Sequence, residues 1–374
     1  MAVSRRAKEL AASGIDVVDL SAGEPDFDSP AVAVDAAARA LREGKTRYTA
    51  AAGLPELRQA VASDYRERYS APWDGSQVVI TVGGKAALFE LALALAGPGD
   101  EIVIPLPYWV TFPEQVRLAG GEPVFVETSV AEGFRLRAEA VCAKLSERTR
   151  AVILNSPSNP TGRLIDEPDL VAIVEACAER GIPVIADETY DRFVFDGGPF
   201  ASAATLAQRF PETVIVVGSF SKTYAMTGWR IGFMLGPSKV VKAVSTIQSH
   251  ATSNPTTFAM YGALAALEGA EDRVEEMLAA YRRRLGLVKS QMDGLAGFEC
   301  PAPVGAFYVF PDVSACYREG CRGSVDFSSF LLEEARVAVV PGIAFGCDEH
   351  IRISFACSEE RLTEGIERIR AAIA

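Results

Sequence analysis

VIVVGSFSKTYAMTGWRIGFM, residues 214–234, is the most informative stretch of this 374-residue sequence. Its first four residues are β-branched, which is typical of a buried strand. Lys222 follows among Ser, Thr, Met and aromatic residues, where burial would lower the pKa of its amine and free it to attack a carbonyl carbon. The common alternative is a solvated surface lysine. The nearby hydroxyls of Ser219 and Ser221 and the guanidinium of Arg230 indicate an anion site.

Outward from this stretch, short β-branched runs alternate with amphipathic segments. The runs are residues 78–82, 101–104, 123–126, 151–154 and 183–186. Residues 85–96, 166–180 and 271–295 carry apolar residues at spacings of three and four, as helices with one buried face do. This alternation predicts an α/β fold in which helices cover a mostly parallel sheet.

A second, smaller domain is expected after residues 271–295. A Gly- and Pro-rich passage follows that helix, and the strand and helix patterns beyond it are residues 306–310, 327–334, 351–355 and 359–372. The chain is also longer than one hydrophobic core usually organises. We therefore expect a large domain of residues 30–286 and a small domain of residues 1–29 and 287–374.

The composition excludes several classes of function. A net charge of −12 and a pI near 4.9 argue against a protein that binds nucleic-acid backbones. Seven cysteines without CxxC spacing, beside only two histidines, indicate reduced thiols and no metal site. No apolar run is long enough to span a bilayer, and residues 1–14 do not resemble an export signal. We expect a cytoplasmic protein.

Asp187 ends the apolar run of residues 182–186, at the carboxyl end of a predicted strand. Ligand sites of open α/β sheets gather at that edge, where a carboxylate would hold a cationic ring nitrogen. The alternative is that Asp187 caps the following turn, which is common for an aspartate at a strand end. Tyr190 would face the same ligand or lie in the core.

Three further patterns fit a ligand site. Gly83-Gly84-Lys85 separates a strand from a helix, so backbone N–H groups and the helix dipole would face a phosphate, unless the glycines only form a tight turn. The loop NSPSNPTG, residues 155–162, would carry the Asn159 amide to the sheet edge. Arg352, in a strand pattern, suits a carboxylate or extends to solvent.

Taken in order, these elements resemble the class I/II aminotransferases of pyridoxal 5'-phosphate (PLP) fold type I, and most of all the prokaryotic-type aspartate aminotransferases. The resemblance runs nearly end to end. Its motifs are SAGEPDF, YTAAAGLPELR, VGGKAALFE, PYWVTFPE, NSPSNPTG, ADETY, SFSKTYAMTGWRIGF, GAFYVF, VVPGIAFG and IRISFA. It implies a mostly parallel seven-stranded sheet flanked by helices, a smaller α+β domain, and PLP as the cofactor.

The resemblance also implies roles for single residues. Lys222 would be the Schiff-base lysine, and Asp187 would pair with the pyridinium nitrogen of PLP. Tyr190 and Asn159 would hydrogen-bond the ring oxygen, and Trp109 would stack on the ring. The residues implied at the phosphate are Gly84, Lys85, Ser219, Ser221 and Arg230.

Substrate contacts and a partner subunit follow from the same resemblance. Arg352 would grip the α-carboxylate of an amino acid or 2-oxo acid, and the backbone of Gly23 would close over it. Lys85 matches the lysine that binds the distal carboxylate of the substrate in prokaryotic-type aspartate aminotransferases. Trp109 and Asn159 would also contact the substrate. Tyr48 would reach the phosphate of a neighbouring subunit, in a homodimer with shared active sites.

We therefore expect a ping-pong aminotransferase that uses aspartate and 2-oxoglutarate. Relatives usually have a further N-terminal segment, ending in a Pro-Ser-x-Thr-like stretch over the active site, and this sequence starts just after that position. Aromatic or prephenate-type substrates therefore stay open, and so does a PLP-dependent lyase, because a fold does not fix which Cα bond breaks. A regulatory DNA-binding module is disfavoured, since no helix-turn-helix pattern precedes Ser21.

Overall fold

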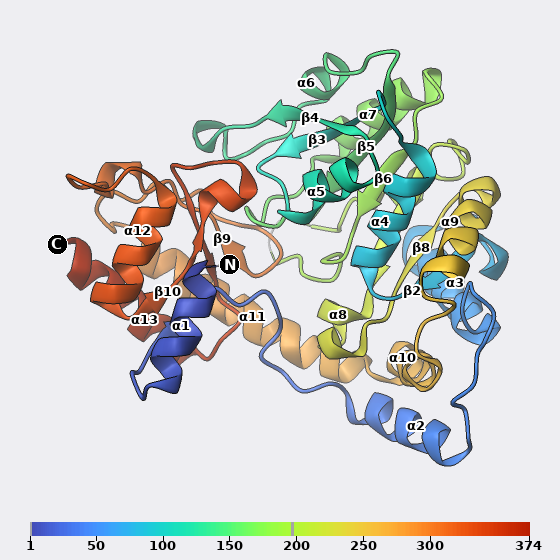
Figure 1. Cartoon of the computed structure of the whole chain (residues 1–374), viewed down its shortest axis with the longest axis horizontal. Helices are drawn as coiled ribbons and strands as arrows, with labels where there is room; N and C mark the ends of the chain where they lie inside the picture. Colours follow the sequence, from blue (N-terminus) through green and yellow to red (C-terminus); the bar gives the residue numbers. More distant parts are fainter. Residues whose placement is uncertain (1, 196–197) are drawn as a thin grey trace.

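The computed structural model describes residues 2–195 and 198–374, which form two unequal groups of elements (Figure 1). The larger group surrounds a seven-stranded sheet, and the smaller one holds two short sheets. The strands of the large sheet are β2 (Val78–Thr81), β3 (Glu101–Leu106), β4 (Glu122–Glu127), β5 (Thr149–Asn155), β6 (Val184–Asp187), β7 (Val214–Ser219) and β8 (Gly232–Leu235).

The strand order is β2-β8-β7-β6-β5-β3-β4, and β8 alone runs against the other strands of this sheet. This confirms the predicted mostly parallel seven-stranded sheet. The sequence pattern predicts every strand except β8. That strand has four residues, it opens on Gly232, and glycine is depleted in strands. Antiparallel pairing with both β2 and β7 secures it in the sheet.

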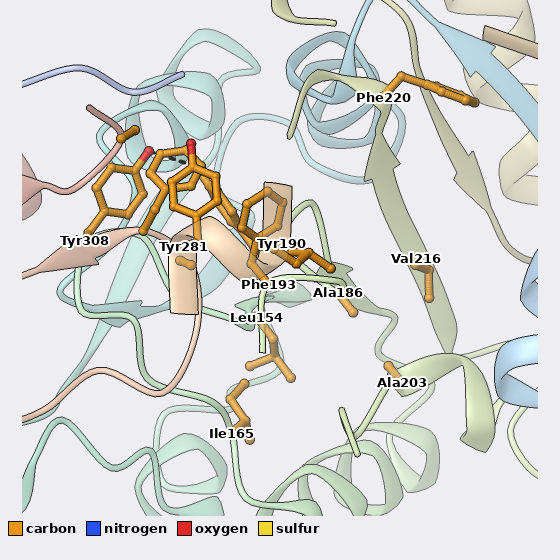
Figure 2. Packing of buried hydrophobic residues seen from close by; sticks show 14 of the residues in the cluster. Leu154, Ile165, Ala186, Tyr190, Phe193, Ala203, Val216, Phe220, Tyr281 and Tyr308 are labelled. Atoms are coloured by element: carbon orange, nitrogen blue, oxygen red, sulfur yellow. Dashed lines mark hydrogen bonds between the residues drawn. The ribbon is translucent and has the colours of Figure 1, made fainter. Parts of the chain in front are cut away.

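Alternation along the strands builds two apolar layers, one on each face of the sheet. In β7, Val214 and Val216 lie in one layer, whereas Ile215 and Val217 lie in the other. Successive side chains of a strand point to opposite faces, so a β-branched run buried on both sides serves both layers. Figure 2 shows the first layer, with Val216 among its residues. Each such side chain contributes roughly 1.5–3 kcal/mol by its burial.

Helices cover both faces, as the amphipathic segments predict. On one face lie α4 (Gly84–Leu95), α5 (Thr111–Leu118) and α9 (Ser238–Ala251). On the other lie α3 (Pro55–Tyr69), α6 (Ala138–Cys142), α7 (Glu167–Glu179) and α10 (Thr257–Gly269), with α2 (Ala31–Arg42) packed on α10. The helix predicted at residues 271–295 is α11 (Glu271–Met292), which runs from the large sheet towards the smaller group (Figure 1).

The smaller group combines short strands and helices, as expected for an α+β unit. One sheet pairs β1 (Val18–Asp19) with β10 (Val337–Ala338), and the other has the order β11 (Val340–Pro341), β12 (Ile351–Ser354), β9 (Tyr308–Val309). The helices are α1 (Ala2–Ala12), α12 (Ser324–Phe330) with a π-helical turn over Leu331–Ala335, and α13 (Glu359–Ile373). The division into residues 30–286 and the two flanking ranges stays a prediction.

The cysteines and the helices can be compared with what the composition predicts. All seven cysteines are free thiols. Across residues 2–195 and 198–374, no helix combines the length and the apolar character needed to cross a bilayer.

Candidate active site

A cleft of about 520 Å³ opens at the carboxyl ends of β5, β6 and β7, and the small antiparallel sheet forms part of its wall. This volume lies within the ordinary range for ligand sites. Every predicted site residue except Tyr48 lines it. These residues are Gly23, Gly84, Lys85, Trp109, Asn159, Asp187, Tyr190, Ser219, Ser221, Lys222, Arg230 and Arg352.

Asp187 is the last residue of β6 and is 5% exposed. Its Oδ1 accepts a hydrogen bond from the Thr189 backbone N–H at 3.1 Å. Desolvation raises the pKa of the carboxyl to about 6, against the opposing effects of Thr189 and of the Lys222 charge. A buried carboxyl with a raised pKa is suited to a cationic partner, since that partner would restore the charged form.

Lys222 lies in α8 (Phe220–Thr223), the short helix that follows β7. Ser219 caps that helix, because its Oγ accepts a hydrogen bond from the Ser221 N–H at 3.1 Å. The Lys222 amine donates to the carbonyl oxygen of Gly23. Desolvation lowers the pKa of this amine to about 8, although the carboxylate of Glu24 acts in the opposite direction. A lowered pKa makes the neutral, nucleophilic amine more accessible near neutral pH.

The start of α4 and the loop after α8 form a cradle for an anion. A Cβ on Gly84 would lie 3.3 Å from the Gly218 carbonyl oxygen, a contact tighter than most side chains make. A Cβ on Gly83 would lie 2.5 Å from Nη2 of Arg230. Arg230 has φ of 56°, a left-handed conformation that is uncommon for a residue with a side chain and is often found at functional sites. Backbone N–H groups, two serine hydroxyls and one guanidinium thus face the same space.

Lys85 and Trp109 line the cleft beside each other. The Lys85 amine lies 4.9 Å from the centre of the Trp109 ring, a cation–π distance. Burial lowers the pKa of Lys85, and the charge of Arg230 adds to this effect. The ring of Phe112 packs edge-on against the ring of Trp109, and the two ring centres are 5.5 Å apart.

Arg352 reaches the cleft from β12 and is 7% exposed. Its Nη1 donates to Oδ1 of Asn159 at 3.1 Å, and its Nη2 donates to the Ser21 carbonyl oxygen at 2.8 Å. Its Nε is buried without a hydrogen-bond partner. The guanidinium lies 4.3 Å from the centre of the Tyr308 ring. The guanidinium of Arg352 is therefore held in place, and some of its N–H groups remain available to donate to a carboxylate.

Tyr190 is buried, and its hydroxyl lies 2.9 Å from the hydroxyl of Tyr308. Desolvation raises the pKa of Tyr190 far above its ordinary value, so the phenol stays protonated. Sequence reasoning missed Tyr308 as a site residue, although it lies in the motif GAFYVF. It also missed other residues that line the cleft, which are Glu24, Leu88, Asn155, Thr189 and Thr227.

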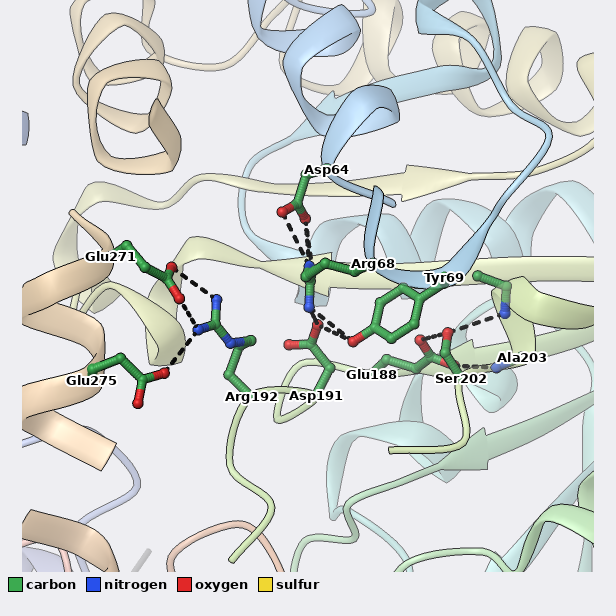
Figure 3. Close-up of polar contacts among 11 residues, drawn as sticks. Asp64, Arg68, Tyr69, Glu188, Asp191, Arg192, Ser202, Ala203, Glu271 and Glu275 are labelled. Atoms are coloured by element: carbon green, nitrogen blue, oxygen red, sulfur yellow. Dashed lines mark hydrogen bonds and ion pairs between the residues drawn. The ribbon is translucent and has the colours of Figure 1, made fainter. Parts of the chain in front are cut away.

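Behind Asp187, the segment of residues 188–192 is fastened by polar contacts (Figure 3). Glu188 accepts hydrogen bonds from Ser202 Oγ at 2.6 Å and from the Ala203 N–H at 2.7 Å. Asp191 accepts one from Arg68 Nη1 at 2.6 Å. Burial raises the pKa of Glu188 to about 8.

Arg192 continues these contacts to the start of α11. Its guanidinium bonds to Glu271 and lies 3.2 Å from a carboxylate oxygen of Glu275. Side chains that do not line the cleft thus hold the backbone that carries Asp187 and Tyr190.

Tyr48 lies outside this cleft. Its side chain is 86% exposed and lines a separate surface groove with residues 254–258. Within one chain, the structure therefore gives Tyr48 no contact with the other site residues.

The donor set fits PLP. A lysine amine, a buried carboxyl and an anion cradle are the three features that an aldehyde, a pyridinium nitrogen and a phosphate require, and all of them line one cleft. Gly84 opens α4, and it lines the same cleft as the Arg230 guanidinium, so the helix N-terminus and a cation are both available to a phosphate.

Comparisons with known proteins agree with this geometry. Residues 15–369 match the family described as "Aminotransferase class I and II". The "Probable aspartate/prephenate aminotransferase" of Aquifex aeolicus (strain VF5) is 46% identical, and the alignment covers 100% of this chain and 95% of that protein. The "Aspartate aminotransferase" of Bacillus subtilis (strain 168) is 41% identical over 99% of this chain and 94% of its own. The solved structure of the Thermus thermophilus aspartate aminotransferase with maleate has a TM-score of 0.94 at 41% identity, covering 99% of this chain and 95% of that one.

Proposed function

The chain belongs to the class I and II aminotransferases, and from that premise we propose that it transfers the amino group of aspartate to 2-oxoglutarate. It is a PLP-dependent enzyme, as this family is. The observation that supports a dicarboxylate substrate is that Arg352 and Lys85 line the same cleft, in addition to the proposed Schiff-base Lys222 and phosphate ligand Arg230. A dicarboxylate would place one carboxylate at Arg352 and the other at Lys85.

Four residues would hold and use the cofactor ring. Bound PLP supplies an electron sink for the pair left at Cα. Lys222 would link to the cofactor and, once displaced by substrate, move the proton between Cα and the cofactor's C4'. Asp187 would keep the proton on the ring nitrogen, and Tyr190 and Asn159 would donate hydrogen bonds to the ring oxygen.

The remaining residues would bind phosphate and substrate. Trp109 would stack on the ring and fix its plane. The proposed phosphate ligands are Gly84, Lys85, Ser219, Ser221 and Arg230. Arg352 would take the α-carboxylate through its planar fork, and the Gly23 segment, which already contacts Lys222, would cover the substrate.

Prephenate-type substrates are a second candidate. The relatives from Aquifex aeolicus and Cereibacter sphaeroides are named for both aspartate and prephenate, at 46% and 42% identity. A 2-oxo acid that carries a second carboxylate on a ring would use the same two cationic groups.

We also propose a homodimer with shared active sites in the cytoplasm. The exposure of Tyr48, outside its own chain's cleft, supports a role at the phosphate of a partner subunit. The free cysteines fit a reducing compartment.

The experiment is spectroscopic. Aspartate, glutamate, phenylalanine and tyrosine are added one at a time to the PLP-loaded protein, and the cofactor absorption is followed. We expect aspartate and glutamate to convert the cofactor to its amino form much faster than the aromatic amino acids do. Equal rates for all four would overturn the dicarboxylate proposal, and absence of a cofactor band would overturn PLP binding.

A Lys85→Ala variant tests the source of this preference. We expect kcat/KM for aspartate to fall roughly ten- to hundredfold, because one charge-assisted contact is lost. The matched control is Lys239→Ala, at an exposed lysine of α9 outside the cleft. An equal loss for aspartate and phenylalanine would contradict a role for Lys85 at the distal carboxylate.

A further inference from the structure

Tyr308 joins the two functional ends of the cleft. It lies in β9, which pairs with the strand of Arg352 and places Tyr308 opposite Ser354. The side chain is fully buried, yet it lines the cleft. Its hydroxyl meets the hydroxyl of Tyr190, whereas its ring face meets the guanidinium of Arg352. One side chain thus contacts both the tyrosine beside the cofactor ring and the arginine beside the substrate carboxylate.

We propose that Tyr308 is a positioning residue that fixes Tyr190 at the cofactor ring oxygen and Arg352 at the substrate carboxylate. The inference rests on the proposed function, because both contacts matter only if the cleft binds PLP and a carboxylate. It assigns separate tasks to the two parts of the side chain. The hydroxyl acts through Tyr190, and the ring acts through Arg352.

The hydrogen bond between the hydroxyls decides where the Tyr190 proton points. Burial raises the pKa of both phenols, so each keeps its proton. The 2.9 Å hydrogen bond between the hydroxyls uses one of these two protons. When Tyr308 donates, the proton of Tyr190 is left for the ring oxygen. A hydroxyl that accepts one hydrogen bond is polarised by it, so the hydrogen bond that this hydroxyl donates becomes stronger. The bond therefore improves Tyr190 as a donor to the cofactor.

The ring contact decides where the guanidinium lies. The two Nη atoms of Arg352 donate hydrogen bonds to Asn159 and to the Ser21 carbonyl oxygen. The centre of the Tyr308 ring lies 4.3 Å from the guanidinium. Cation–π attraction is strongest where water is excluded, as it is beside this buried ring. Gly23 lies over the same place, since a Cβ on it would be 3.7 Å from the Tyr308 hydroxyl.

Two substitutions separate the tasks in the PLP-loaded protein. Tyr308→Phe removes the hydroxyl and keeps the ring, and Tyr308→Leu removes both. The first readout is the pH midpoint of the absorption change of bound cofactor. The second is the Kd of maleate, an unreactive dicarboxylate, from a spectral titration. Tyr317→Phe is the matched control, because it removes a tyrosine hydroxyl bond in the smaller group of elements, 2.6 Å to the Asp348 carbonyl oxygen and outside the cleft.

For Tyr308→Phe we expect the pH midpoint to rise by about 0.5 to 1 unit, because a weaker donor at the ring oxygen competes less with the proton on the Lys222 nitrogen. The Kd of maleate should stay within about twofold, since the ring remains. For Tyr308→Leu we expect the same rise in midpoint and a maleate Kd about tenfold weaker. The control should change neither quantity. If Tyr308→Leu does not fold, Tyr308→Met takes its place.

A double variant tests whether the hydroxyl acts through Tyr190. In a Tyr190→Phe background, Tyr308→Phe should leave the midpoint where Tyr190→Phe alone puts it. A shift that persists in that background would overturn the hydroxyl's task, as would an unchanged midpoint in the single variant. An unchanged maleate Kd in Tyr308→Leu would overturn the ring's task. Failure of all proteins to bind PLP would instead contradict the proposed function.

Discussion

Nη1 of Arg352 donates a hydrogen bond to Oδ1 of Asn159 at 3.1 Å, and this bond joins the small antiparallel sheet to the loop that follows β5. The two residues were predicted separately, one for a substrate carboxylate and one for the cofactor ring. Their contact makes the position of the guanidinium depend on a loop of the large sheet. The residue proposed for the substrate carboxylate and the residue proposed for the cofactor ring are therefore directly bonded to each other.

Replacing Arg352 by Lys should weaken dicarboxylate binding. An ammonium keeps the charge but has only three donors and no planar fork, so it cannot bond Asn159 and the Ser21 carbonyl oxygen while it also donates two parallel bonds to a carboxylate. We expect the Kd of maleate to rise about ten- to hundredfold in the PLP-loaded protein. Arg336→Lys is the control, since that arginine forms a partly exposed ion pair with Glu333 outside the cleft. A similar Kd for both variants would contradict the role of the fork.

Replacing Lys222 by Arg should abolish covalent attachment of the cofactor while preserving a cation. Borohydride should fix PLP to the wild-type protein and leave the variant unlabelled. The half-reaction with aspartate should slow by at least about a thousandfold, because the proton-transfer group at Cα is lost. Mass spectrometry of the intact protein measures the first effect, and stopped-flow absorption measures the second. Covalent labelling of the variant would show that another lysine holds PLP.

Replacing Asp187 by Asn should stabilise the cofactor-free protein increasingly as pH rises. The folded-state pKa of about 6 lies above the ordinary value of 3.8, so ionisation of Asp187 lowers the free energy of unfolding once pH exceeds 3.8. We expect the advantage of the variant to grow from less than about 1 kcal/mol near pH 4 to a few kcal/mol near pH 8.

Urea unfolding at several pH values measures this advantage, with Asp272→Asn at the exposed start of α11 as the control. A difference that does not change with pH would mean that burial does not raise the pKa of Asp187. The same variant should lose aminotransferase activity, because Asn cannot keep a proton on the ring nitrogen by its charge.

Replacing Arg68 by Met should destabilise the fold behind the cleft. The Asp191 side chain is 9% exposed, and it would keep a buried charge without its ion-pair partner. Breaking such a pair costs about 3 kcal/mol, which urea unfolding of the PLP-loaded protein would resolve. Arg209→Met provides the comparison, because its ion pair with Glu175 is largely exposed and should contribute less than about 1 kcal/mol. Equal effects would mean that burial of Asp191 adds nothing.

Residues at the carboxyl ends of the parallel strands could be predicted from sequence because local pattern places them. A β-branched run fixes the strand, and the next residue then lies at the shared edge, as Asp187 and Lys222 do. The helices α4 and α7 likewise match their predicted ranges closely, since each buries one periodic face.

Tyr308 and Glu24 could not be predicted in the same way. Each reaches the cleft only because the smaller group of elements folds against the large sheet, and no local period reports that contact. Glu24 also accepts a hydrogen bond from Oγ1 of Thr227 at 2.7 Å, although the two residues are 203 positions apart in the sequence. Glu24 lies in SAGEPDF and Tyr308 in GAFYVF, but the side-chain contacts of both depend on tertiary packing.

The reversed direction of β8 bears on how the site assembles. Because β7 ends at the sheet edge where β8 begins, the chain leaves that edge at Ser219 and returns to it at Arg230 without a crossover helix. Closing so short a loop costs little chain entropy. Ser219, Lys222 and Arg230 therefore belong to one segment of low contact order, whereas Gly84 and Arg352 reach the cleft only through distant pairings. We expect refolding to order the loop of Lys222 and Arg230 before Gly84 and Arg352 reach the cleft.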